Sequence, residues 1–207
     1  MNLPTPHLAV LSLTLALSAG LVGCGSDKVS SDEQAQVAYL GLDPSIEKSL
    51  ALGFAGFNAA NSANIPTQST TGNLTGTLTI NGQVDQGSSA NKGMRLRMGM
   101  VGYTDGAVRL SEDDEDVSIT YETVTDVASQ PALTLSLRDI PNGTFTGTLV
   151  GTFKMTGDLE DDVTLNLQMS GIIENDGTNH VRRKAGSTTV TGTATSGDDT
   201  FNVNVTL

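Results

Sequence analysis

Residues 143–157 read GTFTGTLVGTFKMTG, and residues 162–174 read DVTLNLQMSGIIE. In both stretches an apolar or small side chain alternates with a polar one, most often threonine. Successive side chains of a β-strand point to opposite faces, so this period of two predicts two long strands, each with one buried and one wet face. The few residues between them are enough only for a hairpin link, which predicts an antiparallel pair.

The same alternation recurs along most of the remaining chain. It is found at residues 73–84, 94–100, 117–121, 133–137, 190–194 and 201–207. Turn-forming stretches such as Thr104-Asp105-Gly106, Pro141-Asn142-Gly143 and Ser196-Gly197-Asp198 separate the runs. Short links between neighbouring strands predict a meander, in which each strand pairs with the next along the chain.

Several glycines fall in the buried phase of these strands, among them Gly147, Gly151, Gly171 and Gly192. Glycine in a strand allows a sharp bend or the close approach of another element. We therefore predict a mainly β domain over residues 70–207, formed by a curved antiparallel meander sheet of about eight strands. The sequence leaves open whether this sheet is barrel-like or a two-layer sandwich.

One helix is predicted before the sheet, in the segment 43–62. Asp43 can cap it with Pro44 at its first position, and Ile46, Leu50, Phe54 and Phe57 then recur at helical spacing. No charged residue occurs from Ser49 to Val84. We therefore expect the helix to pack on the sheet.

The first 23 residues contain no Lys, Arg, Asp or Glu, and residues 8–22 are almost wholly apolar. That length suits the core of a signal peptide and is short for a helix that spans a bilayer. The run ends in Leu21-Val22-Gly23-Cys24, which resembles the lipobox of bacterial lipoproteins. The resemblance implies that residues 1–23 are a signal peptide and that Cys24 becomes the lipidated first residue of the mature protein.

Cys24 is the only cysteine of the chain, so the mature domain has no internal disulfide. Lipid on Cys24 would hold the protein on a membrane, and residues 24–42 are then predicted to be a tether, with Ser31 to Leu40 as a candidate short helix. Gly25 stands where enteric lipoproteins carry the residue that sorts them between membranes. By that resemblance we expect the outer membrane, with a domain that faces the periplasm or the cell surface after export by the general secretory pathway.

The formal net charge of −12 disfavours nucleic acid and anionic lipid head groups as direct partners. The chain has no Trp and only three Tyr, a thin supply for sugar sites that depend on aromatic stacking. The threonine ladders on the wet face are typical of good strand formers and less typical of ice-binding surfaces.

No group of residues in the sequence forms a catalytic or metal motif. The acidic run Glu112–Asp116 and the acidic turn 158–162 lack the spacing of a calcium loop, although loops at the same end could share a weak cation site. The methionines fall in the buried phase and are expected in the core. His180 is the one histidine of the mature chain, and Arg182, Arg183 and Lys184 beside it are expected to form a solvated loop.

The sequence therefore predicts a non-enzymatic lipoprotein of the cell envelope, without cofactor, metal or catalytic residue. Two hypotheses remain open for what it binds. In the first, the curved sheet encloses an apolar cavity that carries a lipid or another hydrophobic ligand. In the second, the core is solid and the outer surface binds an envelope protein. A weak divalent-cation site and an enzyme are less favoured alternatives.

Overall fold

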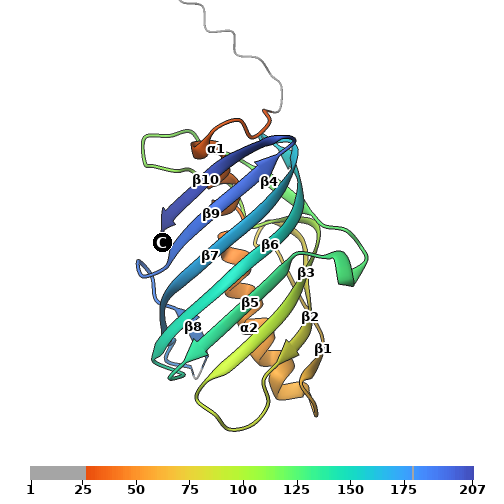
Figure 1. Ribbon diagram of the computed structural model, residues 1–207, viewed down its shortest axis with the longest axis vertical. Coiled ribbons are helices and arrows are strands. Elements are labelled where there is room, and N and C mark those ends of the chain that lie inside the picture. Colours follow the sequence, from red (N-terminus) through yellow and green to blue (C-terminus); the bar gives the residue numbers. More distant parts are fainter. Residues whose placement is uncertain (1–26, 179) are drawn as a thin grey trace, which may run out of the picture.

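The computed structural model describes residues 27–178 and 180–207, so the signal region and Cys24 lie outside the described residues. Two α-helices come first, α1 (Asp32–Leu40) and α2 (Asp43–Ala59), and a single antiparallel sheet follows (Figure 1). Its strands are β1 (Asn64–Thr71), β2 (Thr75–Val84), β3 (Lys92–Thr104), β4 (Ile119–Glu122), β5 (Ala132–Arg138), β6 (Gly143–Gly157), β7 (Asp161–Asn175), β8 (Val181–Arg183), β9 (Thr189–Ser196) and β10 (Asp199–Thr206). A 3₁₀ turn, η1 (Val127–Ser129), lies between β4 and β5.

The ten described strands occupy eight positions across the sheet. At two of these positions, two strands lie one after the other along the same neighbouring strand. β4 and β5 both lie between β3 and β6, where β4 pairs with one end of β6 and β5 with the other. In the same way β8 and β9 pair with different parts of β7. The order across the sheet is therefore β1, β2, β3, β4 with β5, β6, β7, β8 with β9, and β10. This confirms the predicted antiparallel sheet, in which most strands pair with their sequence neighbours.

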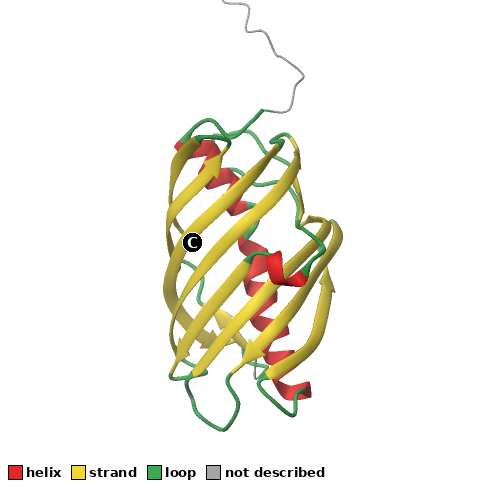
Figure 2. Ribbon diagram, turned by 45° about the vertical axis from the view of Figure 1, so that its right-hand side comes forward, coloured by secondary structure: helices red, strands yellow, loops and turns green. Residues whose placement is uncertain are grey.

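The sheet is strongly curled, and α2 lies along its concave face (Figure 2). The helix contacts β1, β2 and β3 on one side and β8 on the other, so it lies across the gap between distant parts of the sheet. Glycines bring the helix close to the strands. A Cβ on Gly53 would lie 2.8 Å from Met94 Sδ, and one on Gly56 would lie 2.7 Å from Ile65 Cδ1. Side chains therefore fill the space between the helix and the sheet at these points.

Alternation along the strands sets the core, as the sequence predicts. The apolar side chains of the buried phase lie inside, and the methionines 94, 98, 100, 155 and 169 are all buried with them. Leu74 is an exception, because its side chain is 68 % exposed. β2 begins only at Thr75, and its pairing with β3 shifts register between Thr75 and Thr77. The alternation cannot be extended through that shift.

The N-terminal segment is part of the folded domain from Asp27 onward. Asp27 pairs with Leu159 at the β6–β7 turn, where Asp27 N donates to Asp158 O at 3.1 Å. Val29, Ala35 and Tyr39 are buried in the core, and α1 packs against β10. Residues 27–42 are thus not the tether that the sequence suggested. α1 is only nine residues long and buries few side chains, so its polar residues dominate the local sequence and hide the helical spacing.

The sheet also starts earlier than expected, because β1 begins at Asn64 and not near residue 70. A register shift between Ile65 and Gln68 interrupts the alternation of β1, so the strand has no clear period. Among the described residues, no helix is long and apolar enough to cross a membrane.

Candidate functional site

A groove of about 690 Å³ lies beside the C-terminal half of α2. Phe54 and Phe57 of α2 contribute to its lining, together with Ile140 and Pro141 of the β5–β6 turn and Val181 of β8. Phe54, Phe57, Ile140 and Val181 are each half-buried. Small-molecule pockets commonly measure about 300–1,000 Å³ and are lined mainly by apolar side chains. Size and lining therefore make this groove the strongest candidate for an apolar ligand.

The two phenylalanines and the glycines of α2 have different neighbours. Gly53 lies against Met94 and Gly56 against Ile65, whereas Phe54 and Phe57 are partly buried, pack against the edge of the core and also line the groove. Lys92 supports Phe57 from behind, with Nζ 4.5 Å from the centre of the phenyl ring and 2.5 Å from Gly87 O. As the sequence predicts, Phe54 and Phe57 pack against the core that holds Ile46 and Leu50, and the structure shows in addition that they line the groove.

Polar residues form the rim of the groove. Arg182 and Glu174 are joined at 2.8 Å, and His180 Nδ1 lies 3.5 Å from Asp176 Oδ2. Asp176 also accepts hydrogen bonds from the hydroxyl and from the backbone N–H of Thr178. These hydrogen bonds, chiefly the one from the hydroxyl, lower the pKa of Asp176 to about 2. The remaining rim and wall residues are Glu47, Ala51, Ala55, Asn58 and Asn175. The loop that holds His180 thus borders the best-formed apolar groove, a location that its sequence did not indicate.

Arg183 joins β8 to α2. Its guanidinium donates to both carboxylate oxygens of Asp43, at 2.8 and 2.9 Å, and to Glu47 Oε2 at 3.0 Å. The Arg183 side chain is only 10 % exposed. Tyr39 donates its hydroxyl hydrogen bond to Asp43 as well, and burial followed by the charge of Asp43 raises the pKa of Tyr39. The sequence predicted a solvated basic loop at Arg183, but its side chain is buried and joins β8 to α2. We call this ion-paired group of Arg183, Asp43 and Glu47 the first clasp.

A second clasp fixes the other side of α2. Lys48 Nζ lies 2.5 Å from Asp105 Oδ1 and 3.1 Å from Thr71 O. Asp105 also accepts hydrogen bonds from the Tyr103 hydroxyl and from Asn73 N. The two clasps hold the N-terminal half of the helix between β8 and the β1–β2 connection. Glu47 of the first clasp also lies at the rim of the groove, whereas Lys48 and Asp105 do not line it, and we assign both clasps a structural role.

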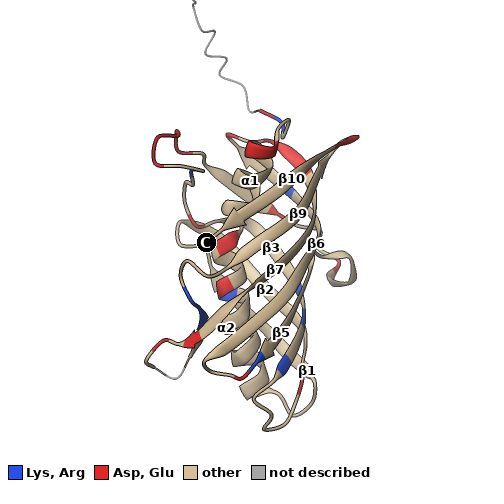
Figure 3. Cartoon of the chain, turned by 60° about the vertical axis from the view of Figure 1, so that its left-hand side comes forward, with Lys and Arg blue, Asp and Glu red and all other residues tan. Residues whose placement is uncertain are grey.

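Acidic residues gather at the end of the sheet where Asp27 enters, as Figure 3 shows. The run 112–116 and the β6–β7 turn meet there around a hollow of about 340 Å³ lined by Asp114, Glu115 and Asp158. Asp158 already accepts a hydrogen bond from Ser118 N at 2.7 Å. No three Asp, Glu, His or Cys residues of the described chain are placed to hold a metal ion.

The outward surface of β6, β7, β9 and β10 forms a different kind of face. Aligned outward positions make four rows across these strands. We call these 16 positions the threonine face: Thr146, Thr148, Val150, Thr152, Thr164, Asn166, Gln168, Ser170, Thr189, Thr191, Thr193, Thr195, Thr200, Asn202, Asn204 and Thr206. At its edge, the Asp32 carboxylate accepts hydrogen bonds from Asn202 N and Nδ2.

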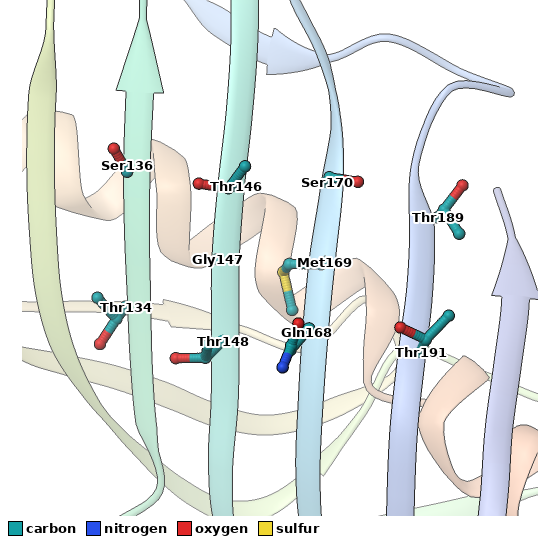
Figure 4. A pocket seen from close by; sticks show the side chains of 10 residues that line it. All are labelled: Thr134, Ser136, Thr146, Gly147, Thr148, Gln168, Met169, Ser170, Thr189 and Thr191. Carbon is teal, nitrogen blue, oxygen red and sulfur yellow. The ribbon is translucent and has the colours of Figure 1, made fainter.

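A shallow trough of about 410 Å³ crosses this face, and Figure 4 shows its lining. Thr134 and Ser136 of β5 extend the trough beyond the threonine face, and Met169 contributes from the buried side of β7. Seven of the ten residues that line the trough are threonine or serine, in contrast to the phenylalanines of the groove beside α2.

Comparison of the chain with family models, with curated protein sequences and with solved structures finds no match. The function has to be argued from the residues and their arrangement.

Proposed function

We propose that this protein is a non-enzymatic lipoprotein of the outer membrane, anchored through Cys24, that binds an apolar ligand in the groove beside α2. The observation that carries the proposal is the groove itself, of about 690 Å³, which is lined by Phe54 and Phe57 together with Ile140 and Val181. Burying apolar ligand surface against these side chains gains about 25 cal/mol per Å². The polar rim suits a ligand with an apolar body and a polar end.

The anchor and the groove support one arrangement. Asp27 is three positions after Cys24, and such a length of chain reaches at most about 11 Å. Lipid on Cys24 would therefore hold the end of the sheet near Asp27 close to the bilayer. The groove is at the other end, beside the β5–β6 turn and the end of α2 (Figure 1). It would then face away from the membrane that carries the protein.

Packing between α2 and the sheet favours a ligand on the surface of the domain over one enclosed within it. Met94 lies against Gly53 and Ile65 against Gly56, where an enclosed cavity would need space. An apolar ligand is thus proposed for the groove beside the helix. The alternative, in which the same groove receives apolar side chains of an envelope protein, is decided by the experiment below.

The ligand proposal is tested with the neutral fluorescent probe N-phenyl-1-naphthylamine and the full lipidated chain in detergent. We expect binding to the native protein and at least a tenfold loss in Phe54→Asp, because a carboxylate in the apolar wall would have to be desolvated. Val124→Asp is the matched control, since Val124 is 53 % exposed and is not in the groove. Native mass spectrometry of protein from cells should find an extractable small molecule.

Equal probe binding by the native protein and by Phe54→Asp would contradict the proposal. A cross-linked envelope protein at the groove, with no extractable ligand, would favour the protein-partner alternative instead. The anchor is tested separately with Cys24→Ser, which should abolish palmitate labelling and move the protein out of the membrane fraction.

A further inference from the structure

The threonine face carries no charged side chain at any of its 16 positions, all of which lie in the described part of the chain. A soluble surface is typically about 25–35 % charged, so about four or five charged residues would be expected there. High strand propensity explains the threonines but not the missing charges. Asparagine is a poorer strand former than lysine or glutamate, and the face contains three asparagines.

The trough in this face is built from two parallel rows of polar side chains. Thr146, Ser170 and Thr189 belong to one row, and Thr148, Gln168 and Thr191 to the other (Figure 4). Neighbouring strands lie about 4.8 Å apart, and successive side chains on one face of a strand lie about 6.7 Å apart. The rows thus form a track across β6, β7 and β9 that follows the outer surface of the sheet, is open to solvent and is elongated in shape.

The chemistry of the track selects an uncharged, polyhydroxylated ligand. Each hydroxyl can donate and accept a hydrogen bond, and the glutamine amide can do both. None of the residues that line the trough is charged, and Arg95, which lies beside Thr134 at the β5 end, is already paired with Asp85. Sugar hydroxyls would find partners along both rows. Threonine methyl groups offer apolar contact to sugar C–H groups, and the side chains of threonine are stiff, so little conformational entropy is lost on binding.

We infer that the trough of the threonine face binds a neutral polysaccharide chain laid across β6, β7 and β9. The face lacks aromatic side chains on which a sugar ring could stack, so each contact is weak. Many copies on one membrane, as the proposed lipid anchor provides, would multiply weak contacts with a long chain. The inference uses the anchor of the proposed function but does not depend on the groove.

The test uses the full lipidated chain on phosphatidylcholine liposomes, mixed with insoluble cellulose, with starch granules or with cross-linked alginate beads. Cellulose and starch are neutral, and alginate is anionic. We expect liposomes with the native protein to sediment with at least one neutral polysaccharide and not with alginate. The double variant Thr148→Lys, Thr191→Lys should lose at least tenfold in retention, because two long side chains would project over the track and obstruct a polysaccharide laid along it.

Val101→Lys with Leu74→Lys is the matched control, because both residues are exposed and neither lines the trough. It adds the same charge and should keep full retention. No retention on cellulose or starch would overturn the inference, as would equal loss in both double variants. Association of the chain through this face, seen as a dimer that the trough variant dissolves, would also overturn it. Loss of groove binding alone leaves these results unchanged.

Discussion

Arg183 shows how one side chain connects segments that are far apart in the sequence. Its guanidinium bridges Asp43 and Glu47, which are one turn apart on α2, from a strand about 140 residues later. Removing one partner of a buried ion pair leaves the other charges uncompensated, which typically costs about 3–5 kcal/mol. The free energy of unfolding should therefore depend strongly on this residue.

We expect Arg183→Ala to lower the free energy of unfolding by about 3 kcal/mol or more, measured by urea denaturation. Arg182→Ala is the control, because Arg182 is 55 % exposed and pairs only with Glu174 at the surface. Its effect should stay within about 0.5 kcal/mol. If both variants unfolded at the same urea concentration, the assignment of Arg183 as a clasp would be wrong.

Asp105 links stability to pH. Burial acts to raise its pKa, but the hydrogen bonds from Lys48, Tyr103 and Asn73 N outweigh burial and hold the pKa below its usual value. A carboxylate with a lowered pKa stabilises the folded state fully above the unfolded pKa of about 3.9. This stabilisation is lost as the pH falls through the lowered pKa of the folded state.

We therefore expect Asp105→Asn to be less stable than the native protein at pH 7 and to lose less stability between pH 5 and pH 2. Urea midpoints measured across that range would show the difference. Asp113→Asn is the control, since Asp113 is in the exposed acidic run. Its pH dependence should match that of the native protein. Parallel curves for all three proteins would show that Asp105 contributes nothing to acid sensitivity.

Among the elements, β9 depends on a glycine that bends it. Gly192 has φ +147°, and a Cβ there would lie 2.2 Å from Asn166 O of β7. The neighbouring atom belongs to the backbone, so it cannot move aside without disturbing the pairing of β7 with β9. The curl of the sheet at this point thus requires glycine.

Gly192→Ala should destabilise the fold by about 3 kcal/mol or more, since backbone strain and a steric clash add together. Gly177→Ala is the control, because Gly177 also has positive φ (+88°) but has nothing within 4 Å of its Cβ position. Its cost should be near the strain alone, about 1–2 kcal/mol. Thermal melting of both variants would test the difference, and equal shifts would contradict it.

The elements that the sequence predicted well are those with a regular period. The helical spacing of α2 and the alternation of β6 and β7 continue along nearly the whole element, so the bounds of these elements could be predicted within about three residues. The candidate helix from Ser31 to Leu40 matches α1, but its packing into the core was not predicted. β1 and the start of β2 could not be predicted, because register shifts break their periods.

The groove could not be predicted for a different reason. Periodicity places Phe54 and Phe57 on the packed side of α2. The groove also needs Ile140, Pro141 and Val181, which come from segments far along the chain. Likewise the ion pairs of Arg183 join segments whose distance in the sequence gives no hint of contact. In contrast, the alternation in the sequence already showed which side chains of each strand are polar. The threonine face consists of the polar sides of four strands, β6, β7, β9 and β10.

At the scale of the whole molecule, the two ends of the curled sheet differ in charge and in surface. The end near Asp27 carries the acidic run 112–116, the acidic β6–β7 turn and Asp198 with Asp199 (Figure 3). The other end carries the groove and the β2–β3 connection. An anchor at Cys24 would thus place the acidic end against the bilayer, where anionic lipids would repel it.

This orientation can be measured on the lipidated protein. The single natural cysteine is the proposed attachment point of the lipid, so one introduced cysteine can be labelled selectively with a fluorescent donor. We expect a donor on Asp198→Cys, in the β9–β10 turn, to transfer energy to an acceptor in neutral phosphatidylcholine bilayers more efficiently than one on Ser88→Cys, between β2 and β3. The chain between Cys24 and Asp27 reaches only about 11 Å, which keeps the first site near the bilayer.

Replacing part of the phosphatidylcholine by anionic phosphatidylglycerol should reduce the difference between the two sites, because repulsion of the acidic end tilts the domain. High salt should restore the difference, since a Debye length of about 3 Å at 1 M screens charges that face the bilayer across water. Equal transfer from both sites in neutral bilayers would mean that the domain lies on its side, and the groove would then not face away from the membrane.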